Sequence, residues 1–91
     1  MTTAKCRTVE IASDLGVHLR AAGALVRVAG QYEADIWIEH QGTRANAKSI
    51  MSVLSLAAAK GAELNVFAEG ADAEQAVNAI CELIANEFEV S

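Results

Sequence analysis

The sequence predicts an α+β fold: an open-faced two-layer β-sandwich in the order β-α-β-β-α-β-α, with a four-stranded antiparallel sheet and three helices on one face. Four segments alternate apolar and polar residues, as half-buried strands do, and three others carry apolar residues at helical spacing. The 91 residues contain no proline, no linker and no low-complexity tract. Residues 1–91 are therefore expected to form a single domain.

The first strand and the first helix are predicted from a change of period. Lys5–Ala12 alternates, with Val9 and Ile11 on the same side. Leu19–Gly30 follows a helical period, and Gly30 is expected to stop this helix. The apolar positions of the helix are Ala22, Leu25, Val26 and Ala29.

A hairpin and a short helix are predicted next. Ala34–His40 alternates again, and Gln41-Gly42 supplies a tight turn into Thr43–Ala47. Ser49 then places a hydroxyl where an N-cap belongs, ahead of a short helical stripe that Gly61 ends. The stripe consists of Ile50, Val53, Leu54 and Ala57.

The last strand and the last helix are separated by a turn with a capping signal. Glu63–Glu69 alternates, and Asp72 with Gln75 three residues later resembles a capping box at the start of a helix over Ala73–Asn86. Leu64, Val66 and Ala68 are expected to point inward from the strand, and Val77, Ile80 and Ile84 from the helix.

The sheet face without helices is expected to meet water. By strand parity it carries Cys6, Thr8, Trp37 and Phe67. Two aromatic side chains on an open face either mark a contact surface or pack locally across neighbouring strands. We favour local packing.

Composition and charge argue against several classes of function. The chain is 53% hydrophobic and 21% charged, as is typical of a globular protein. Its net charge of −5 argues against general binding to nucleic acids or anionic membranes. No apolar stretch approaches membrane-spanning length, and Met1–Ala12 has no signal-peptide core. Cys6 and Cys81 suggest passive packing rather than a disulfide framework or a metal site, so a cytoplasmic protein without metal or cofactor is expected.

His18 is the main candidate for chemistry. It follows a break at Ser13–Gly16 and precedes the first helix, so its ring is expected near free backbone N–H groups and the positive end of the helix. This field disfavours the imidazolium form, and a neutral ring is what a nucleophile needs. The same N–H groups and Arg20 would receive a phosphate or a carboxylate. On this pattern alone, a capping or surface role is the stronger interpretation and a reactive role is the alternative.

Other polar residues allow two readings. Ser49 is an N-cap, a site of regulatory phosphorylation, or both. Met51 is either a core residue or an adaptable apolar contact. Arg27 and Lys48 are expected at the same end as Arg20, where they would form a basic rim for an acidic partner.

Two further groups have only a structural interpretation. His40 is expected to be a solvated turn residue, because it ends a strand with no neighbouring acid, base or second ligand. Glu82, Glu87 and Glu89 are expected to form a solvated helix face.

Two segments carry a resemblance to a known family. Leu15–Val26 reads LGVHLRAAGALV, and Ala47–Ala57 reads AKSIMSVLSLA. The first is similar to the active-site segment, and the second to the regulatory-serine region, of HPr, the histidine-containing phosphocarrier of the bacterial phosphotransferase system. The separation of the segments also fits, and the remaining chain aligns without obvious gaps. The resemblance implies the same open-faced sandwich that the periodicities predict.

The resemblance implies that His18 accepts a phosphoryl group on Nδ1 from phospho-enzyme I, which phosphoenolpyruvate charges, and passes it to a histidine of an enzyme IIA-type acceptor. Such a protein is a phosphocarrier rather than an enzyme. Arg20 matches the arginine that stabilises the phosphate, and Ser49 matches the serine that HPr kinase/phosphorylase modifies in some bacteria. The implied partner-binding residues are Val17, Leu19, Gly23, Arg27, Lys48, Ile50, Met51 and Leu54.

Two departures concern the branch of the family. Ala21 stands where the carbohydrate-type pattern has proline, and the loop reads Asp14-Leu15-Gly16 rather than ending in Asn-Gly. Both features resemble the nitrogen-related branch and similar proteobacterial HPr proteins, which leaves sugar transport and nitrogen regulation open. One alternative is a regulatory binding module of the same fold, controlled by Ser49 phosphorylation without phosphate relay. A small-molecule sensor has only fold analogy in its favour. We expect a monomer, because a carrier presents one face to several partners in turn.

Overall fold

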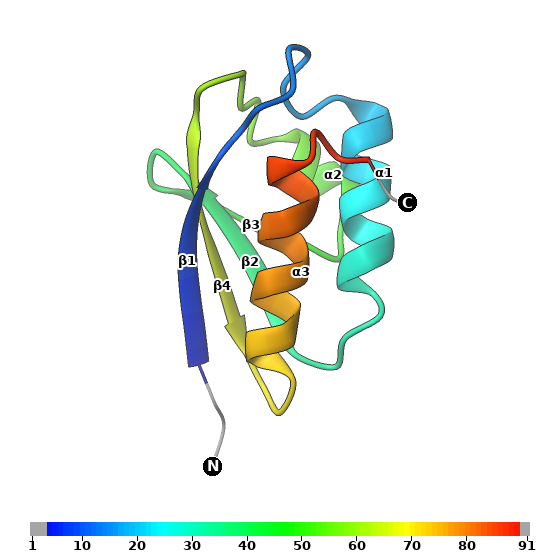
Figure 1. The fold of residues 1–91 in the computed structure, drawn as a ribbon, viewed down its shortest axis with the longest axis vertical. Coiled ribbons are helices and arrows are strands. Elements are labelled where there is room, and N and C mark those ends of the chain that lie inside the picture. Colours follow the sequence, from blue (N-terminus) through cyan, green and yellow to red (C-terminus); the bar gives the residue numbers. More distant parts are fainter. Residues whose placement is uncertain (1–3, 90–91) are drawn as a thin grey trace.

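The computed structural model describes residues 4–89 and has the predicted element order. The elements are β1 (Ala4–Glu10), α1 (Leu19–Ala29), β2 (Asp35–His40), β3 (Thr43–Asn46), α2 (Ile50–Leu54), β4 (Glu63–Glu69) and α3 (Ala73–Ala85). The strands form one antiparallel sheet in the order β1-β4-β2-β3. The helices cover one face of the sheet, with α1 and α3 side by side (Figure 1). The predicted α+β sandwich is confirmed.

The core lies between the sheet and the helices, and most side chains at the predicted apolar positions form it; Val26, Ile50 and Leu54 are only partly buried, and Ala57 is exposed. The buried side chains include Ile36, Ile38, Leu64, Val66 and Ala68 from the sheet, with Ala22, Leu25, Ala29, Val77, Ile80 and Ile84 from α1 and α3. Full burial of a Val, Leu or Ile side chain stabilises the fold by about 1.5–3 kcal/mol. The positions of the apolar residues therefore determine which face of the sheet and which side of each helix pack against one another.

Two elements end at least two residues earlier than their patterns predict. β1 stops at Glu10, because the backbone of Ile11 pairs with the loop before β4 instead: its N–H donates to Ala62 and its carbonyl accepts from Gly61. α2 stops at Leu54, because Ala57 adopts a left-handed backbone with φ of +50°. A left-handed residue cannot continue a right-handed helix.

The predicted capping box at α3 is wrong. Asp72 precedes the helix but makes no side-chain hydrogen bond to it. Its two carboxylate oxygens accept instead from the backbone N–H groups of Glu33, at 2.9 Å, and Ala34, at 2.8 Å. These N–H groups need an acceptor because they follow the α1–β2 turn, and Asp72 thereby ties the start of α3 to the start of β2.

The open face of the sheet shows the local packing that we favoured for its aromatic residues. Cys6, Phe67 and Trp37 lie in one register row across β1, β4 and β2. A residue not singled out in the sequence, Arg44 of β3, places its guanidinium 4.8 Å from the ring centre of Phe67 and 5.9 Å from that of Trp37. The cation therefore covers the ring of Trp37 on the adjacent strand β2 and the ring of Phe67 one strand further, on β4.

Cys6 is exposed on β1 and Cys81 is buried in α3, and both are free thiols. Burial raises the pKa of the Cys81 thiol, which fits a packing role. Within residues 4–89 no helix is long and apolar enough to cross a membrane. The same residues contain no cluster of three or more His, Cys, Asp or Glu that could hold a metal ion.

Candidate functional site

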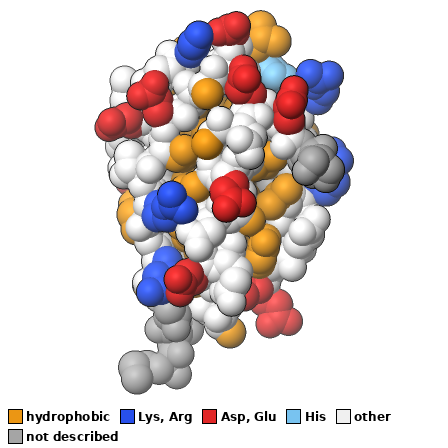
Figure 2. Space-filling model, viewed as in Figure 1, with side chains coloured by type: hydrophobic (Ala, Val, Ile, Leu, Met, Phe, Trp, Pro, Cys, Tyr) orange, Lys and Arg blue, Asp and Glu red, His pale blue; other side chains and the backbone are white. Residues whose placement is uncertain are grey.

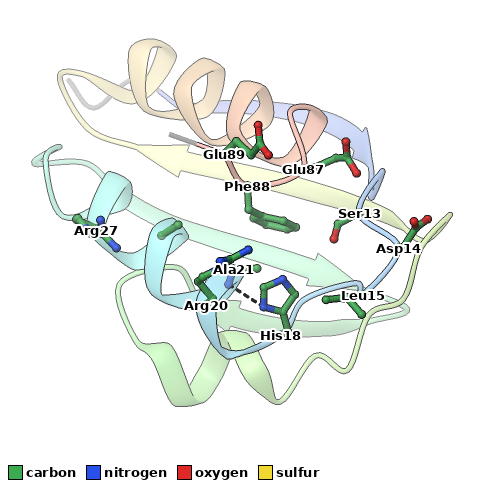
Figure 3. Close-up of a pocket in the computed structure, with 11 residues that line it drawn as sticks. Ser13, Asp14, Leu15, His18, Arg20, Ala21, Arg27, Glu87, Phe88 and Glu89 are labelled. Carbon is green, nitrogen blue, oxygen red and sulfur yellow. Dashed lines mark hydrogen bonds between the residues drawn. The ribbon is translucent and has the colours of Figure 1, made fainter. Parts of the chain in front are cut away.

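His18 is the N-cap residue of α1. Its backbone is extended, with φ −96° and ψ 178°, and its Nδ1 atom accepts a hydrogen bond of 3.2 Å from the backbone N–H of Ala21 (Figure 3). Its carbonyl accepts from the N–H of Ala22 at 2.8 Å. The imidazole thus occupies the place that a Ser or Asp side chain takes at other helix starts. Because Nδ1 accepts this bond, its lone pair is free of a proton and the ring proton is assigned to Nε2.

The loop before His18 is held against the loop that follows α2. Gly16 has a φ of +65°, and a Cβ atom there would lie 2.4 Å from the carbonyl oxygen of Ala58. That same oxygen accepts a hydrogen bond of 3.0 Å from Val17 N–H. Asp14 pairs with Lys60 at 2.7 Å between the same loops, and this bond lowers the pKa of Asp14 and raises that of Lys60. These contacts fix the approach of the chain to His18.

A cavity of about 630 Å³ opens beside the His18 ring. Three parts of the chain line it: the loop before α1, one side of α1, and the residues after α3 (Figure 3). The lining residues are Ser13, Asp14, Leu15, His18, Arg20, Ala21, Ala24, Arg27, Glu87, Phe88 and Glu89. Figure 2 shows the molecule from the same side as Figure 1. A histidine side chain is exposed near the upper end of this view, with acidic and basic side chains on either side of it.

Arg20 and Arg27 are the two cations of this cavity. Both are exposed, and the ion pairs within 4.0 Å among residues 4–89 are Arg44–Glu39 and Lys60–Asp14 only. Neither guanidinium of the cavity is therefore paired with a described carboxylate. Arg20 lies in the first turn of α1, so its guanidinium and the N–H groups at the start of the helix make this end suited to an anion, whereas Arg27 lies in the last turn.

Exposed apolar side chains surround the His18 end of the helices. Leu19 on α1 and Met51 on α2 are 67% and 74% exposed, and Leu15, which the sequence did not single out, is 76% exposed. A Cβ atom on Gly23 would lie 3.9 Å from the Ile50 side chain, so α1 and α2 are in close contact there. Val17, Ile50 and Leu54 are partly buried against the core.

The expected basic rim beside Arg20 is wrong for both residues: Arg27 lines the cavity but lies in the last turn of α1, and Lys48 does not line the cavity. The ammonium group of Lys48 donates a hydrogen bond of 2.8 Å to the carbonyl oxygen of Tyr32, which lies beyond the C-terminal end of α1, whereas His18 starts this helix. Lys48 is therefore held away from the cavity. Ser49 is the N-cap of α2, as predicted, and accepts a long hydrogen bond of 3.4 Å from Ser52 N–H.

Two structural interpretations need correction. His40 is half-buried, and its Nδ1 atom is buried without a hydrogen-bond partner among residues 4–89, so it is not a fully solvated turn residue. Glu87 and Glu89 are not on a helix face, because α3 ends at Ala85 and both residues line the cavity beside His18. The signal that could have revealed this is Phe88, an aromatic residue between two glutamates just beyond the helical period.

The comparisons with known proteins agree with one another. The family model described as "PTS HPr component phosphorylation site" matches residues 5–86. The chain is similar to HPr-C-His from Thermoanaerobacter tengcongensis, with 37% identity, a TM-score of 0.89 and coverage of 96% of this chain and 98% of that one.

Two further solved structures are similar to the chain. The phosphocarrier protein HPr from Bacillus anthracis has 35% identity, a TM-score of 0.86 and coverage of 90% and 98% of the two chains. An HPr dimer from Thermoanaerobacter tengcongensis has 36% identity, a TM-score of 0.75 and coverage of 90% and 94%. Because the family model covers most of the sequence and these relatives share the fold over nearly their whole lengths, the chain belongs to the HPr family, the phosphocarrier components of the phosphotransferase system rather than enzymes with a turnover of their own.

Proposed function

We propose that His18 receives a phosphoryl group from phospho-enzyme I and passes it to a histidine of an enzyme IIA-type acceptor. The observation that carries this proposal is the hydrogen bond from Ala21 N–H to His18 Nδ1 at the start of α1. It orients the Nδ1 lone pair and holds the ring in an open cavity that Arg20 also lines. A nucleophile that is unprotonated and fixed in place needs little rearrangement before attack.

The transfer is balanced without a net proton change. The Nδ1 lone pair of His18 forms the new N–P bond while the N–P bond to the donor histidine breaks, and the donor nitrogen leaves with that electron pair. The ring proton stays on Nε2. Once the Nδ1 lone pair bonds to phosphorus, it no longer accepts the hydrogen bond from Ala21 N–H. An oxygen of the transferred phosphoryl group can then accept that hydrogen bond. Arg20 supplies the charge-assisted hydrogen bonds that stabilise the transferred group.

Partners are expected to dock on the exposed apolar side chains around His18. Leu19 and Met51 are the exposed large apolar side chains among the expected partner-binding residues, and Arg27 adds a positive charge in the last turn of α1. Val17, Gly23, Ile50 and Leu54 support the surface from below rather than forming its outer layer. An apolar patch with a charged edge is typical of a surface that meets partners transiently.

Ser49 is proposed as a regulatory phosphorylation site. The hydrogen bond from Ser52 N–H to the Ser49 hydroxyl is long, so its loss on phosphorylation would destabilise α2 only slightly. A phosphate is also electrostatically tolerated at the start of a helix. The added charge would stand next to Ile50 and Met51 in the chain. Docking of a partner on that apolar surface would then require desolvation of the phosphate, which lowers affinity.

We further propose that the protein acts as a monomer in the cytoplasm, with either a sugar-uptake or a nitrogen-regulatory acceptor. Ala21 at the first turn of α1 is compatible with both branches, because alanine is a good helix former where the carbohydrate-type pattern has proline.

The test of the function is the intact mass of the protein after incubation with enzyme I and phosphoenolpyruvate. We expect the gain of one phosphate that brief acid treatment removes, as phosphohistidine requires, and no gain in His18→Ala. A chain that stays unmodified with a competent enzyme I would overturn the proposal. An acid-stable phosphate that appears only with ATP and a serine kinase would favour the regulatory module instead.

A further inference from the structure

The residues after α3 form a tight hook, Asn86–Glu89. Glu87 and Phe88 both have left-handed backbones, with φ of +58° and +64°. The N–H of Phe88 donates a short 2.7 Å hydrogen bond back to the carbonyl of Leu83. Left-handed conformations are unfavourable for residues other than glycine, and two in succession persist only where the surrounding structure compensates for them.

Packing of Phe88 supplies this compensation. Its side chain is only 7% exposed and belongs to the hydrophobic core. It lines the same cavity as Ala21 and Ala24 of α1, and its ring points toward the His18 end of the cavity in Figure 3. The hook is therefore anchored against the helix that begins at the proposed phosphoryl acceptor.

The anchor places two carboxylates at the rim of the cavity, and Figure 3 shows both on the far side of the Phe88 ring from His18. Glu87 and Glu89 flank Phe88, are exposed, and line the cavity that also contains His18. Asp14 is the third carboxylate there, but Lys60 pairs with it. Arg20 and Arg27 are the cations of the cavity. Attraction of the guanidinium groups for a phosphate dianion is thus opposed by two carboxylates. Neither forms an ion pair within 4.0 Å among residues 4–89, although the charge of Glu87 helps to raise the pKa of Lys60.

We infer that Glu87 and Glu89 raise the phosphoryl-transfer potential of this carrier, an inference that rests on His18 being the phosphoryl acceptor. The carboxylates destabilise phospho-His18 relative to the free histidine, because like charges repel more strongly once the phosphate has arrived. A carrier must release its phosphate as readily as it takes it up. Arg20 and the helix N-terminus favour uptake, and the hook favours release.

The size of the effect is limited by solvent. Both carboxylates are exposed, so water and salt screen them, and the combined effect on the phosphorylation equilibrium is expected to be about threefold. Screening also gives the effect a signature: it must fade as ionic strength rises, since the Debye length falls from about 10 Å at 0.1 M to about 3 Å at 1 M. A purely structural role of the hook would not depend on salt in this way.

The experiment measures how limiting phosphate partitions between two chains. ¹⁵N-labelled wild type and unlabelled Glu87→Gln/Glu89→Gln are mixed with catalytic enzyme I and a small amount of phosphoenolpyruvate, and intact mass gives the phosphorylated fraction of each chain at equilibrium. We expect the variant to hold about three times as much phosphate as wild type at low salt, with the ratio approaching one near 1 M salt.

The matched control is Glu74→Gln/Glu82→Gln, which removes the same charge from exposed positions of α3 that do not line the cavity. It should divide the phosphate equally with wild type. Equal division by the hook variant, a ratio that salt does not change, or the same ratio in the control would each overturn the inference. If neither chain takes up phosphate while a reference HPr does, the proposed function itself fails and the inference falls with it.

Discussion

The Nδ1 atom of His18 lies 3.2 Å from the backbone nitrogen of Ala21 and caps α1 with the same lone pair that is proposed to attack phosphorus. From the sequence alone, a capping role and a reactive role are alternatives for this histidine. The geometry makes the two compatible. While Nδ1 accepts the Ala21 hydrogen bond it cannot carry a proton, and the helix end that it caps is the place where a phosphate oxygen would bind.

The two roles of His18 are separable by substitution. His18→Ala removes both the cap and the nucleophile, so we expect no phosphorylation and a loss of about 1 kcal/mol in the free energy of unfolding. His18→Asn removes the nucleophile but supplies a side chain that caps well, so its stability should stay near that of wild type. Urea unfolding and intact mass measure the two properties. Equal destabilisation of both variants would show that the cap contributes nothing.

Gly16 is expected to be essential for the position of His18. Gly16→Ala adds a Cβ atom 2.4 Å from the Ala58 carbonyl oxygen to a residue with φ +65°, whereas Gly42→Ala adds one at φ +82° with no atom within 4 Å. Left-handed alanine alone costs about 1 kcal/mol, so this is the expected loss for Gly42→Ala. The clash should cost Gly16→Ala at least about 1 kcal/mol more, with slower phosphoryl transfer. Similar stability and transfer rates for the two variants would contradict this account.

Elements with a clear hydrophobic period could be predicted from the sequence, and contacts between distant segments could not. The strands and helices follow their apolar stripes, since burial of those stripes is the main driving force. Asp72 looks like a helix cap locally, but the free N–H groups nearest to its carboxylate belong to Glu33 and Ala34, 38 or more positions away. No local pattern shows that competition.

The residues of the candidate site also fall into a group that could be predicted from the sequence and a group that could not. His18 and Arg20 stand next to a helix start in the sequence, so their neighbourhood was predictable. Glu87 reaches the cavity through a left-handed hook. Phe88 is a signal in the sequence that this segment is buried, but the left-handed backbone of Glu87 and Phe88 does not follow from their residue types. The position of Arg44 could have been predicted. The two-residue turn of the predicted hairpin pairs Arg44 with Glu39, which puts Arg44 on the same face of the sheet as Trp37.

Arg20→Ala is expected to leave the fold intact and to slow transfer. Arg20 is exposed, and none of the hydrogen bonds or ion pairs of residues 4–89 depends on its guanidinium. Loss of a charge-assisted hydrogen bond to the phosphate should lower the transfer rate about 10- to 100-fold. Arg44→Ala is the matched control: it should transfer normally and lose about 0.5–1 kcal/mol of stability with its aromatic contacts. A large drop in the melting temperature of Arg20→Ala would instead assign that residue a structural role.

Asp72 is expected to make folding stability depend on pH at the acidic end. The hydrogen bond from Glu33 N–H is the largest cause that holds the pKa of its carboxyl below the ordinary value of 3.8; the bond from Ala34 N–H adds to this and burial opposes it. Because the folded pKa is the lower one, the stabilising contribution is fully present well above 3.8 and is lost as the pH falls through the folded value.

Replacement of Asp72 by asparagine removes this dependence, since an amide does not ionise and its NH₂ group cannot accept the second N–H. Asp72→Asn should therefore be clearly less stable than wild type near pH 6, and the gap should narrow near pH 3 and below. Urea unfolding over this range measures it. Asp35→Asn serves as the control, because no hydrogen bond to that exposed carboxylate occurs within residues 4–89, and it should track wild type throughout. A gap for Asp72→Asn that is equally wide at both pH values would mean that the carboxylate charge is not what holds Glu33 and Ala34 in place.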